Sequence, residues 1–420
     1  MDGANGAPSI PALYHAPMAA KIELSPGQQS ALDRVGEWYK TPGQQILRLF
    51  GAAGTGKTTI ARLVPEITGA KCHYGAYSGK AVSVLRAKGC LPARTLHSLL
   101  YAPPTDLRHE LGRLEKLPDA PGRAERIQAV RTRIKTEGAL SFRPSDDSPL
   151  DDTELIIVDE VSMVGDRMAD DLLDHPAKVL VLGDPHQLPP VKGGGALTNA
   201  PADVVLTEIH RQALDSPVLS LATAIREGSC LNPQALAPRR RRWWEYDQIL
   251  TWRRRTRWSA IRAIRSRSGA PADTPCSGDR IMCLVNNSDL GIYNGQTWTC
   301  TEVEPYDDGL VLLHLIDDDR CTVQIPTYLQ GFTEAGEDSL ERLGGTGDPH
   351  MIATFAQALT VHKAQGSEWD SVLIMDETPS MFAMEARRRG ALDASDLTRK
   401  WLYTAVTRAS QEVAIIAPRK

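Results

Sequence analysis

The sequence lacks several features that would place it in a particular class of protein. None of its seven cysteines forms a CxxC pair and their number is odd, so we expect neither a zinc site nor a disulfide framework but ordinary thiols in a reducing cytoplasm. No apolar run approaches the ~18 residues of a membrane span. The N-terminus also lacks the charged-then-apolar pattern of a signal peptide. These absences predict a cytoplasmic protein that does not act at a membrane.

An excess of positive charge is missing as well. The 48 Lys and Arg and 52 Asp and Glu give a net charge of −4, so any nucleic-acid binding would need a locally basic track. The hydrophobic content of 42% and charged content of 24% are typical of globular proteins. A chain of 420 residues exceeds one ordinary core, so two main domains with inserted modules are expected. Residues 1–20, rich in Gly, Ala and Pro, are predicted to form a flexible tail.

Apolar runs that end in polar residues predict an α/β fold with parallel strands. Ile46–Phe50 runs into a Gly-rich turn and a helix, Leu155–Val158 runs into Asp159, and Lys178–Leu182 runs into a Gly-Asp pair. The alternation continues with Gln248–Thr251 and a basic helical stretch. Because the carboxyl ends of parallel strands meet at one edge of a sheet, this edge is the predicted site.

Two stretches interrupt the alternation and are predicted to be insertions. Residues of about 102–150 begin with a charged, helix-like part and end in a short strand or hairpin near Ser141. They form either a surface excursion or a strand-separating pin. From Asp279 to Asp319, short β-like runs with turns at Asn294-Gly295 predict a small barrel, inserted at about residues 285–350.

The segment from Gly51 to Thr58, GAAGTGKT, predicts a phosphate-binding loop. Its glycines let backbone N–H groups turn toward phosphates at a helix N-terminus, Lys57 reaches the β and γ oxygens, and Thr58 can ligate Mg²⁺. ATP and Mg²⁺ are therefore the expected cofactors. The residues predicted to bind the nucleotide here are Gly51, Ala52, Ala53, Gly54, Thr55, Gly56, Lys57, Thr58 and Thr59.

Polar residues after the later strands complete a hydrolytic set. Asp159 is predicted to hold Mg²⁺, directly or through water, and Glu160 to polarise the attacking water. Gln187 carries an amide that can donate to a γ-phosphate and accept from water. The alternatives are a solvated loop carboxylate for either acid and a rigid Pro-rich turn around Gln187.

Four motifs in this order carry a resemblance to a known family: DEVSM (residues 159–163), GDPHQLPPV (183–191), TVHKAQGSE (360–368) and YTAVTRA (403–409). They resemble superfamily 1 helicases of the RecD-like branch, including phage-encoded forms. The resemblance implies RecA-like domains at residues 21–195 and 196–420, with the insertion in the second an SH3-like barrel. It also implies ATP in the cleft between them, single-stranded DNA across both, and 5′-to-3′ movement.

The resemblance assigns further roles around the nucleotide. Gln28 would read adenine, although Ser25-Pro26 is equally typical of a helix start. Arg211 and Arg408 would reach the γ-phosphate, and cations of this kind contribute on the order of 10³–10⁵ in rate. The alternative for Arg211 is a salt bridge at a helix start. The residues that would couple the DNA strand to the nucleotide are Gln365, Gly366 and Glu368.

Residues that contact the DNA strand are implied in both domains. Their hydroxyl, imidazole and ammonium groups suit phosphate contacts that do not depend on base sequence. They are Ser78, Lys80, Thr95, His97, Thr360, His362 and Lys363. A second candidate is the Arg/Trp-rich region, residues 239–258, which suits either phosphate neutralisation with base stacking or a solvated helix whose tryptophans lie in the core. Within this region, relatives usually have a Gly-Arg-Asn-like start where the present chain has Trp252-Arg253-Arg254.

Taken together, these residues predict an ATP-dependent DNA helicase that translocates on single-stranded DNA and unwinds duplex DNA. The implied partners are single-stranded DNA and duplex junctions, and the implied setting is a bacterial cell or a phage-infected host. We expect a monomer, and leave open its role in replication, recombination or repair and any protein partners there. Two alternatives remain: an RNA-directed helicase of the same superfamily, and an ATP-gated single-strand-binding clamp or loader without unwinding.

Overall fold

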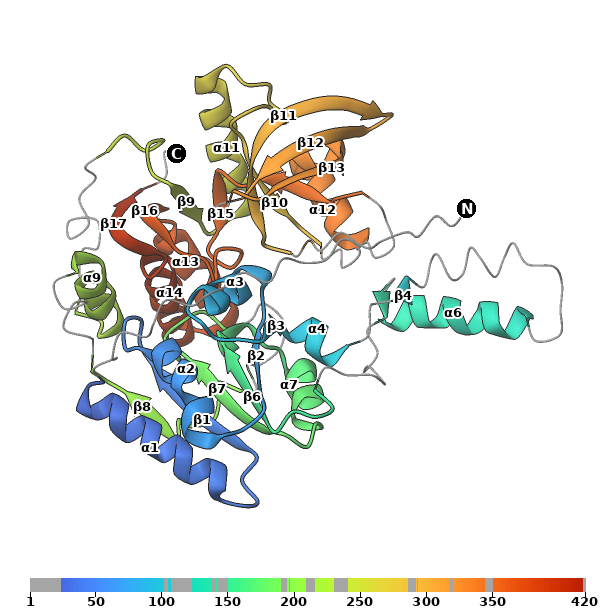
Figure 1. Cartoon of the computed structure of the whole chain (residues 1–420). Helices are drawn as coiled ribbons and strands as arrows, with labels where there is room; N and C mark the ends of the chain where they lie inside the picture. The colour runs from blue at the N-terminus through green and yellow to red at the C-terminus, as the bar shows by residue number, and fades with distance from the viewer. Residues whose placement is uncertain are drawn as a thin grey trace.

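The structure is a computed structural model, and it arranges the chain in two main lobes with a projecting arm (Figure 1). The predicted tail, residues 1–20, and Arg211 lie outside the described residues. Within the described part, no helix is both long and apolar enough to cross a bilayer. The structure describes residues 24–101, 105–106, 123–137, 140–141, 150–189, 195, 197–208, 216–229, 241–285, 292, 294–317, 320–343 and 350–417.

The first lobe is built on a parallel sheet, as the apolar runs predicted. Its described strands lie in the order β3-β2-β6-β7-β1-β8. Helices α1, α2 and α3 pack on one face and α4 and α7 on the other, which explains why the central strands are apolar without alternation. The strands are β1 (Ile46–Gly51), β2 (Cys72–Ala76), β3 (Ala93–Thr95), β6 (Leu155–Asp159), β7 (Lys178–Gly183) and β8 (Val204–Leu206). The helices are α1 (Pro26–Lys40), α2 (Lys57–Thr68), α3 (Gly79–Ala87), α4 (Leu96–Leu100) and α7 (Asp166–Leu173), with the short 3-10 turn η1 (Val161–Met163).

The projecting arm corresponds to the first predicted insertion. A short antiparallel pair joins β4 (Thr105–Asp106) to β5 (Leu140–Ser141), and α6 (Arg123–Glu137) lies beside it, away from both lobes (Figure 1). The short strand or hairpin predicted near Ser141 thus includes a short strand, which pairs with a strand at the start of the insertion. A strand-separating role for the arm stays a prediction.

The second lobe holds a smaller parallel sheet. Its described strands lie in the order β15-β9-β16-β17. Helices α9, α13 and α14 cover one face, and α11 with the neighbouring antiparallel sheet covers the other. The strands are β9 (Gln248–Thr251), β15 (Ala358–Thr360), β16 (Trp369–Met375) and β17 (Ala409–Ile416). The helices are α9 (Pro217–Arg226), α11 (Arg254–Ser268), α13 (Thr378–Arg389) and α14 (Ala391–Val406).

Within the described residues, the second predicted insertion is an antiparallel sheet whose strands lie in the order β13-β12-β11-β10-β14 (Figure 1). A parallel bridge between Thr327 and Met351 connects the β13 edge to the segment before β14, so the sheet curls toward closure. Its first and last strands lie outside the predicted 285–350, and its SH3-like character stays a prediction. The elements are β10 (Arg280–Cys283), β11 (Thr297–Asp307), β12 (Leu310–Ile316), β13 (Thr322–Tyr328), β14 (Ala353–Phe355), the 3-10 turn η2 (Leu329–Phe332) and α12 (Glu334–Leu343).

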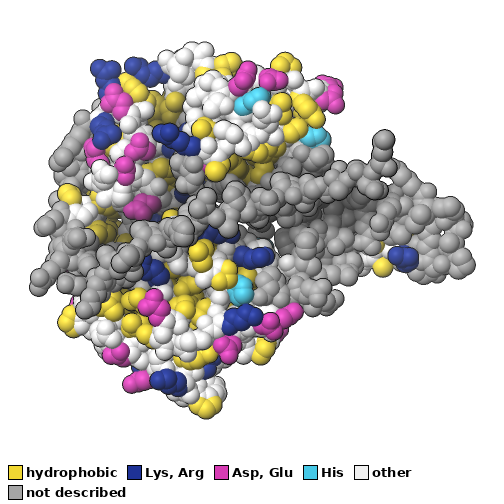
Figure 2. Space-filling view, viewed as in Figure 1, with side chains coloured by type: hydrophobic (Ala, Val, Ile, Leu, Met, Phe, Trp, Pro, Cys, Tyr) yellow, Lys and Arg dark blue, Asp and Glu magenta, His cyan; other side chains and the backbone are white. Residues whose placement is uncertain are grey.

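The Arg/Trp-rich region lies partly in the core and partly at the surface. Trp258 and Arg257 are each 1% exposed, because one face of α11 packs on the antiparallel sheet. Trp244 lies nearer the surface, with the Arg267 guanidinium 3.6 Å from its ring centre. Arg257 and Trp258 therefore follow the core alternative, whereas Arg241, Arg242, Arg253 and Arg255 are exposed, and a nucleic-acid contact for the region stays a prediction. On the face in Figure 2, basic and acidic side chains are interspersed over both lobes, in keeping with the balanced composition.

Candidate nucleotide-binding and strand-binding site

The phosphate-binding loop lies between β1 and α2 at the carboxyl edge of the first sheet. Gly56 is the α2 N-cap in a left-handed conformation (φ 84°), and a Cβ there would collide with the Gln28 amide. Only glycine fits both demands. The Lys57 ammonium donates to the carbonyl oxygens of Gly51, at 2.7 Å, and Ala52, at 3.0 Å. The lysine thus reaches across the loop, as a phosphate ligand requires.

The two predicted magnesium ligands face one another. The Thr58 hydroxyl lies 3.4 Å from Asp159 Oδ2, which brings α2 next to the end of β6. A hydroxyl and a carboxylate are hard oxygen donors of the kind Mg²⁺ prefers. The pair therefore fits this ion. When bound, Mg²⁺ would neutralise phosphate charge.

Glu160 has a strained backbone and a perturbed carboxyl group. Its φ of 53° is left-handed, a conformation that residues with a side chain seldom adopt outside functional sites. Burial raises the pKa of its carboxyl group above the usual range, Asp159 and Asp184 add to the effect, and Arg408 and Lys57 oppose it. A carboxyl group with a raised pKa in a cleft is suited to accept a proton from water.

Gln187 lies next to this acid set and is 7% exposed. Among the described residues its Oε1 has no hydrogen-bond partner. Buried polar atoms are nearly always paired, so an unpaired amide oxygen here fits a missing water or ligand. Its contact to the attacking water stays a prediction.

The second lobe contributes side chains directly to this site. The Tyr403 hydroxyl, on α14, donates to Asp184 Oδ2 at 2.6 Å and accepts from the Ala53 backbone N–H at 3.1 Å. Next to it, the Thr404 hydroxyl accepts from the Leu188 N–H at 2.9 Å. The phosphate loop and the turn after β7 are thereby bonded to one helix of the other lobe.

Arg408 follows α14 and is 5% exposed. Its guanidinium donates to the Thr404 carbonyl at 3.2 Å and the Ser367 carbonyl at 3.3 Å, while its charge acts on Glu160. The positive charge of Arg408, in the second lobe, therefore acts on the carboxyl group of Glu160, in the first. The predicted partner cation, Arg211, lies outside the described residues.

Sequence reasoning missed Tyr403, Thr404 and Asp184 as members of this site. Tyr403 and Thr404 are in the YTAVTRA motif, about one helical turn before Arg408, so they share its face of α14. That spacing was the signal that could have found them. Asp184 was quoted only as part of a turn.

Gln28 is used by the chain itself. Its Oε1 accepts from the Ser25 N–H at 3.0 Å, completing a capping box at the start of α1, and its Nε2 donates to the Thr55 carbonyl at 3.0 Å. The helix-start alternative is thus observed. An adenine contact stays a prediction and would require these bonds to be exchanged.

Two predicted strand contacts of the first lobe act as helix caps. The Ser78 hydroxyl accepts from the Ala81 N–H and begins α3, and the Thr95 hydroxyl accepts from the Ser98 N–H and begins α4. Gly366 packs close to Ser78: a Cβ on it would lie 2.9 Å from the Ser78 hydroxyl. The motifs predicted to contact the DNA strand, one in each lobe, are therefore in contact at Ser78 and Gly366.

The predicted histidine contacts are neutral at pH 7. Burial lowers the pKa of His97 to about 4 and also lowers that of His362. Neither imidazole then supplies charge, so phosphate attraction falls to the lysines of these motifs. Lys363 is bonded to Glu337 at 3.1 Å.

The remaining predicted residues have varied surroundings. Gln365 is buried and donates to the Leu188 carbonyl at 3.1 Å, which joins the strand motif to the turn after β7. Glu368 is exposed, and Lys80 and Thr360 are partly exposed. Thr59 lies in the first turn of α2 beside the phosphate loop, together with the other loop residues Ala53, Gly54 and Thr55.

Comparison with sequence families gives two matches. The family described as AAA domain matches residues 23–241, and the UvrD-like helicase C-terminal domain matches residues 355–416. The first match includes the strands of the first parallel sheet, and the second includes β15, β16 and β17 of the second parallel sheet. The second match contains both the strand motif and Arg408.

Two curated proteins illustrate the similarity in sequence. The ATP-dependent RecD2 DNA helicase of Deinococcus radiodurans is 26% identical over 421 residues, which cover 94% of the chain and 49% of that protein. The RecBCD enzyme subunit RecD of Mycobacterium tuberculosis is 29% identical over 171 residues, or 40% of the chain and 22% of that protein. The chain spans about half the length of the first of these relatives.

Solved structures share the fold. A structure of Pif1 helicases at forked double-stranded DNA has a TM-score of 0.55 at 19% identity, covering 95% of the chain and 93% of that protein. Pif1 of Bacteroides bound to single-stranded DNA has a TM-score of 0.52 at 20% identity, with the same coverage. Together with the parallel sheets, this likeness confirms the α/β fold with P-loop lobes.

Proposed function

The chain belongs to the AAA-domain family, and on this premise, with its RecD-like superfamily 1 motif order, we propose that it is an ATP-dependent DNA helicase. One observation carries the proposal: Arg408 of the second lobe acts on Glu160 of the first, at the cleft where Tyr403 bonds to the phosphate loop. An ATPase whose two lobes both contact the terminal phosphate can convert hydrolysis into relative motion of the lobes.

The proposed division of labour follows from the contacts. Lys57 and the loop N–H groups bind the phosphates of ATP, and Thr58 with Asp159 holds Mg²⁺. Glu160 accepts a proton from the attacking water, Gln187 orients that water, and Arg408 stabilises the charge that develops on the phosphate. Arg211 is proposed as the second cation. Closing and opening of the cleft then alternate the hold of the two lobes on single-stranded DNA.

DNA as the track rests on the relatives, and 5′-to-3′ movement rests only on the resemblance of the motifs to RecD-like helicases. RecD2 of Deinococcus radiodurans is named as a DNA helicase, and the Bacteroides Pif1 structure contains single-stranded DNA. We carry both properties to the present chain as part of the proposal. The arm with α6 is the element proposed to separate the strands.

Strand displacement on partial duplexes tests the function and its polarity. The chain should release the short strand from a duplex with a 5′ overhang, in an ATP-dependent reaction, and leave the 3′-overhang substrate intact. Lys57→Ala should abolish hydrolysis and displacement while single-strand binding stays within a few-fold, because the loop lies apart from the strand motifs. Displacement from the 3′ overhang alone would reverse the polarity, and stimulation by RNA but not DNA would favour an RNA helicase. Strand binding with ATP hydrolysis but without displacement of streptavidin from oligonucleotide ends would favour a clamp.

A further inference from the structure

The turn after β7 belongs to the first lobe in sequence, but its last residue is attached to the second lobe. This residue, Leu188, is fully buried, and its side chain packs in a hydrophobic cluster that otherwise consists of second-lobe residues. Its backbone N–H donates to the Thr404 hydroxyl at 2.9 Å, and its carbonyl accepts from the Gln365 amide at 3.1 Å. The second lobe therefore holds the side chain and both backbone polar groups of Leu188.

The beginning of the turn is fixed to the first lobe. Gly183 ends β7, which has a neighbouring strand on each side in the first sheet, and Asp184 follows directly. The Asp184 carboxylate also accepts from the Tyr403 hydroxyl of the second lobe, at 2.6 Å. Because the turn starts on the first sheet and ends in the core of the second lobe, relative motion of the lobes must change its conformation.

Gln187 is the residue that such a change would move. It directly precedes Leu188, is 7% exposed, and carries the Oε1 atom that has no hydrogen-bond partner among the described residues. Its backbone N–H donates to the Asp184 carbonyl at 3.1 Å, within the same turn. Misplacing a catalytic group by about 1 Å can lower a rate by on the order of 10²-fold. The amide proposed to orient the attacking water thus depends for its position on bonds made by the second lobe.

The Thr404 side chain suits this attachment. It is fully buried on α14, and its hydroxyl donates to the Lys400 carbonyl at 2.7 Å within the same helix. A hydroxyl group has a single proton, so the bond to Lys400 leaves the Thr404 oxygen as an acceptor, which is what the Leu188 N–H requires. Threonine is a poorer helix former than alanine, so helix propensity does not explain its presence here.

Gln365 connects the same turn to the motif predicted to contact the nucleic-acid strand. It lies within that motif, residues 360–368, and is 4% exposed. The next residue, Gly366, packs against the first lobe, where a Cβ on it would lie 2.9 Å from the Ser78 hydroxyl. A strand that shifts this motif would therefore also shift a side chain that is bonded to Leu188.

We propose that Thr404 is a positioning residue for ATP hydrolysis, which acts through Leu188 to place Gln187 against the attacking water. Gln365 holds the same peptide and makes this placement depend on the bound strand. The inference rests on the proposed function and deepens it, since it gives a route by which strand binding regulates the ATPase site. Thr404 itself touches neither the nucleotide nor the water.

A double-mutant cycle tests the placement. In stopped-flow ATPase assays of the full chain with saturating oligothymidylate, Thr404→Val should lower kcat about 10- to 100-fold and leave KM for ATP within about threefold. Valine keeps the shape of the side chain but cannot accept from the Leu188 N–H. Gln187→Ala should lose at least as much, and the double variant should lose no more than Gln187→Ala alone. Losses that multiply, or an unaltered kcat in Thr404→Val, would overturn the proposal.

Two further variants separate positioning from stability. Thr404→Ser keeps the hydroxyl and should restore most of kcat. Thr398→Val is the matched control, because Thr398 lies on the same helix and its hydroxyl donates to the Ala394 carbonyl at 2.6 Å, so its kcat should equal that of the wild-type chain. A loss in Thr404→Ser as large as in Thr404→Val would contradict the role of the hydroxyl.

Gln365→Leu removes the donor to the Leu188 carbonyl and tests the same attachment if Thr404→Val fails to fold. Its loss of kcat should also disappear in a Gln187→Ala background, and the ratio of kcat with and without oligothymidylate should fall toward one. An unchanged ratio would overturn the dependence on the strand. If the wild-type chain hydrolysed no ATP at all, the proposed function itself would be contradicted. If it hydrolysed ATP normally and these variants did too, only the positioning role would be contradicted.

Discussion

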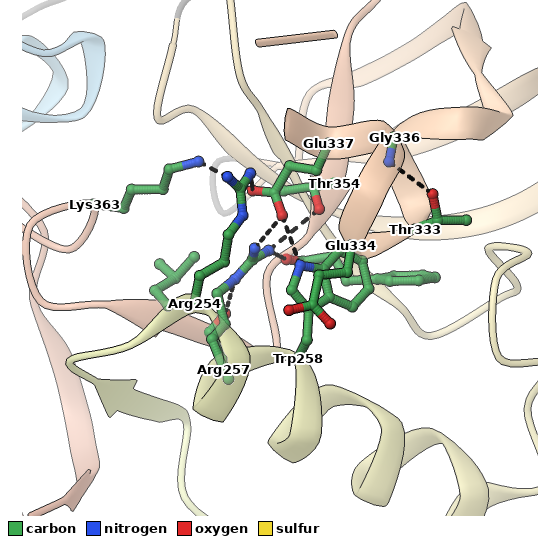
Figure 3. A network of polar contacts seen from close by, with 12 residues as sticks. Arg254, Arg257, Trp258, Thr333, Glu334, Gly336, Glu337, Thr354 and Lys363 are labelled. Atoms are coloured by element: carbon green, nitrogen blue, oxygen red, sulfur yellow. Dashed lines mark hydrogen bonds and ion pairs between the residues drawn. The ribbon is translucent and has the colours of Figure 1, made fainter. Parts of the chain in front are cut away.

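The nucleotide site and the α11–α12 junction each contain a glutamate whose ionisation is opposed by burial, yet the pKa values of the two carboxyl groups shift in opposite directions. Burial raises the pKa of Glu160, and the charges of Arg408 and Lys57 only partly oppose it. Burial also opposes ionisation of Glu337, but Arg257, Lys363 and Arg254 lower its pKa to about 2. The difference is direct contact: the three cations bond to Glu337 (Figure 3), whereas no described cation bonds to Glu160. A bonded carboxylate holds structure together, and an unbonded one remains available for proton transfer.

The largest expected effect comes from removing the distant cation in the cleft. Arg408→Ala should still bind ATP but hydrolyse it more slowly by a factor on the order of 10³–10⁵, since the charge that develops on the phosphate is no longer stabilised. Stopped-flow ATPase assays with saturating DNA measure this. Arg399→Ala, on the exposed side of the same helix, is the control. Unaltered hydrolysis in Arg408→Ala would remove Arg408 from the catalytic set.

Glu160→Gln should lower hydrolysis by a factor on the order of 10²–10⁴ and abolish its dependence on one ionisation. Because burial raises the pKa of this carboxyl group, wild-type turnover should rise as pH increases through that raised value. The amide cannot ionise, so the variant should lack this acidic limb in a plot of kcat against pH. Retention of the same limb in the variant would assign the ionisation to another group.

Glu337→Gln should reduce stability rather than chemistry, because it leaves Arg257 buried without its partner. Breaking a buried ion pair in this way costs about 3–5 kcal/mol. Urea unfolding measures the loss, and Glu334→Gln, at its exposed pair with Arg262, should lose less than about 1 kcal/mol. Equal losses in the two variants would contradict the distinction between the two carboxylates.

The same comparison has a pH signature. The pKa of Glu337 is about 2 in the folded chain, below its ordinary 4.5. Its contribution to stability is therefore fully present above pH 4.5 and is lost as the pH falls toward 2. Glu160 has the opposite sign: its raised pKa makes folding less favourable as pH rises through the range above its usual value. Unfolding measured at decreasing pH should show the Glu337-dependent loss of stability in the wild-type chain. Glu337→Gln should not show this loss.

Local patterns were sufficient to predict the first sheet, the phosphate loop and the pairing of Asp159 with Thr58. These depend on short apolar runs and on glycines whose conformation other residues resist. Arg408 was implied only by the resemblance of the last motif to RecD-like helicases, and the structure places its charge near Glu160. Arg211, outside the described residues, stays a prediction.

The contacts that local patterns missed join distant parts of the chain. Glu337 meets Arg257 across 80 residues, and its role depends on how α12 packs against α11, which no short pattern specifies. Strand β13 was also missed, because its alternation includes a proline and polar residues. The tryptophans of the Arg/Trp-rich region had two equally good explanations, and packing places Trp258 in the core while Trp243, Trp244 and Trp252 stay partly exposed.

The hydrogen bond from Ala53 to Tyr403 links nucleotide binding to the relative motion of the two lobes. A backbone amide carries a single proton, so the Ala53 N–H that now donates to the Tyr403 hydroxyl must weaken that bond to donate to a phosphate oxygen. A phosphate group that accepts from the Ala53 N–H therefore weakens one hydrogen bond between the two lobes. By thermodynamic reciprocity, a force that separates the lobes increases the affinity of this N–H for the phosphate. Mechanical load on the chain should therefore alter its affinity for nucleotide.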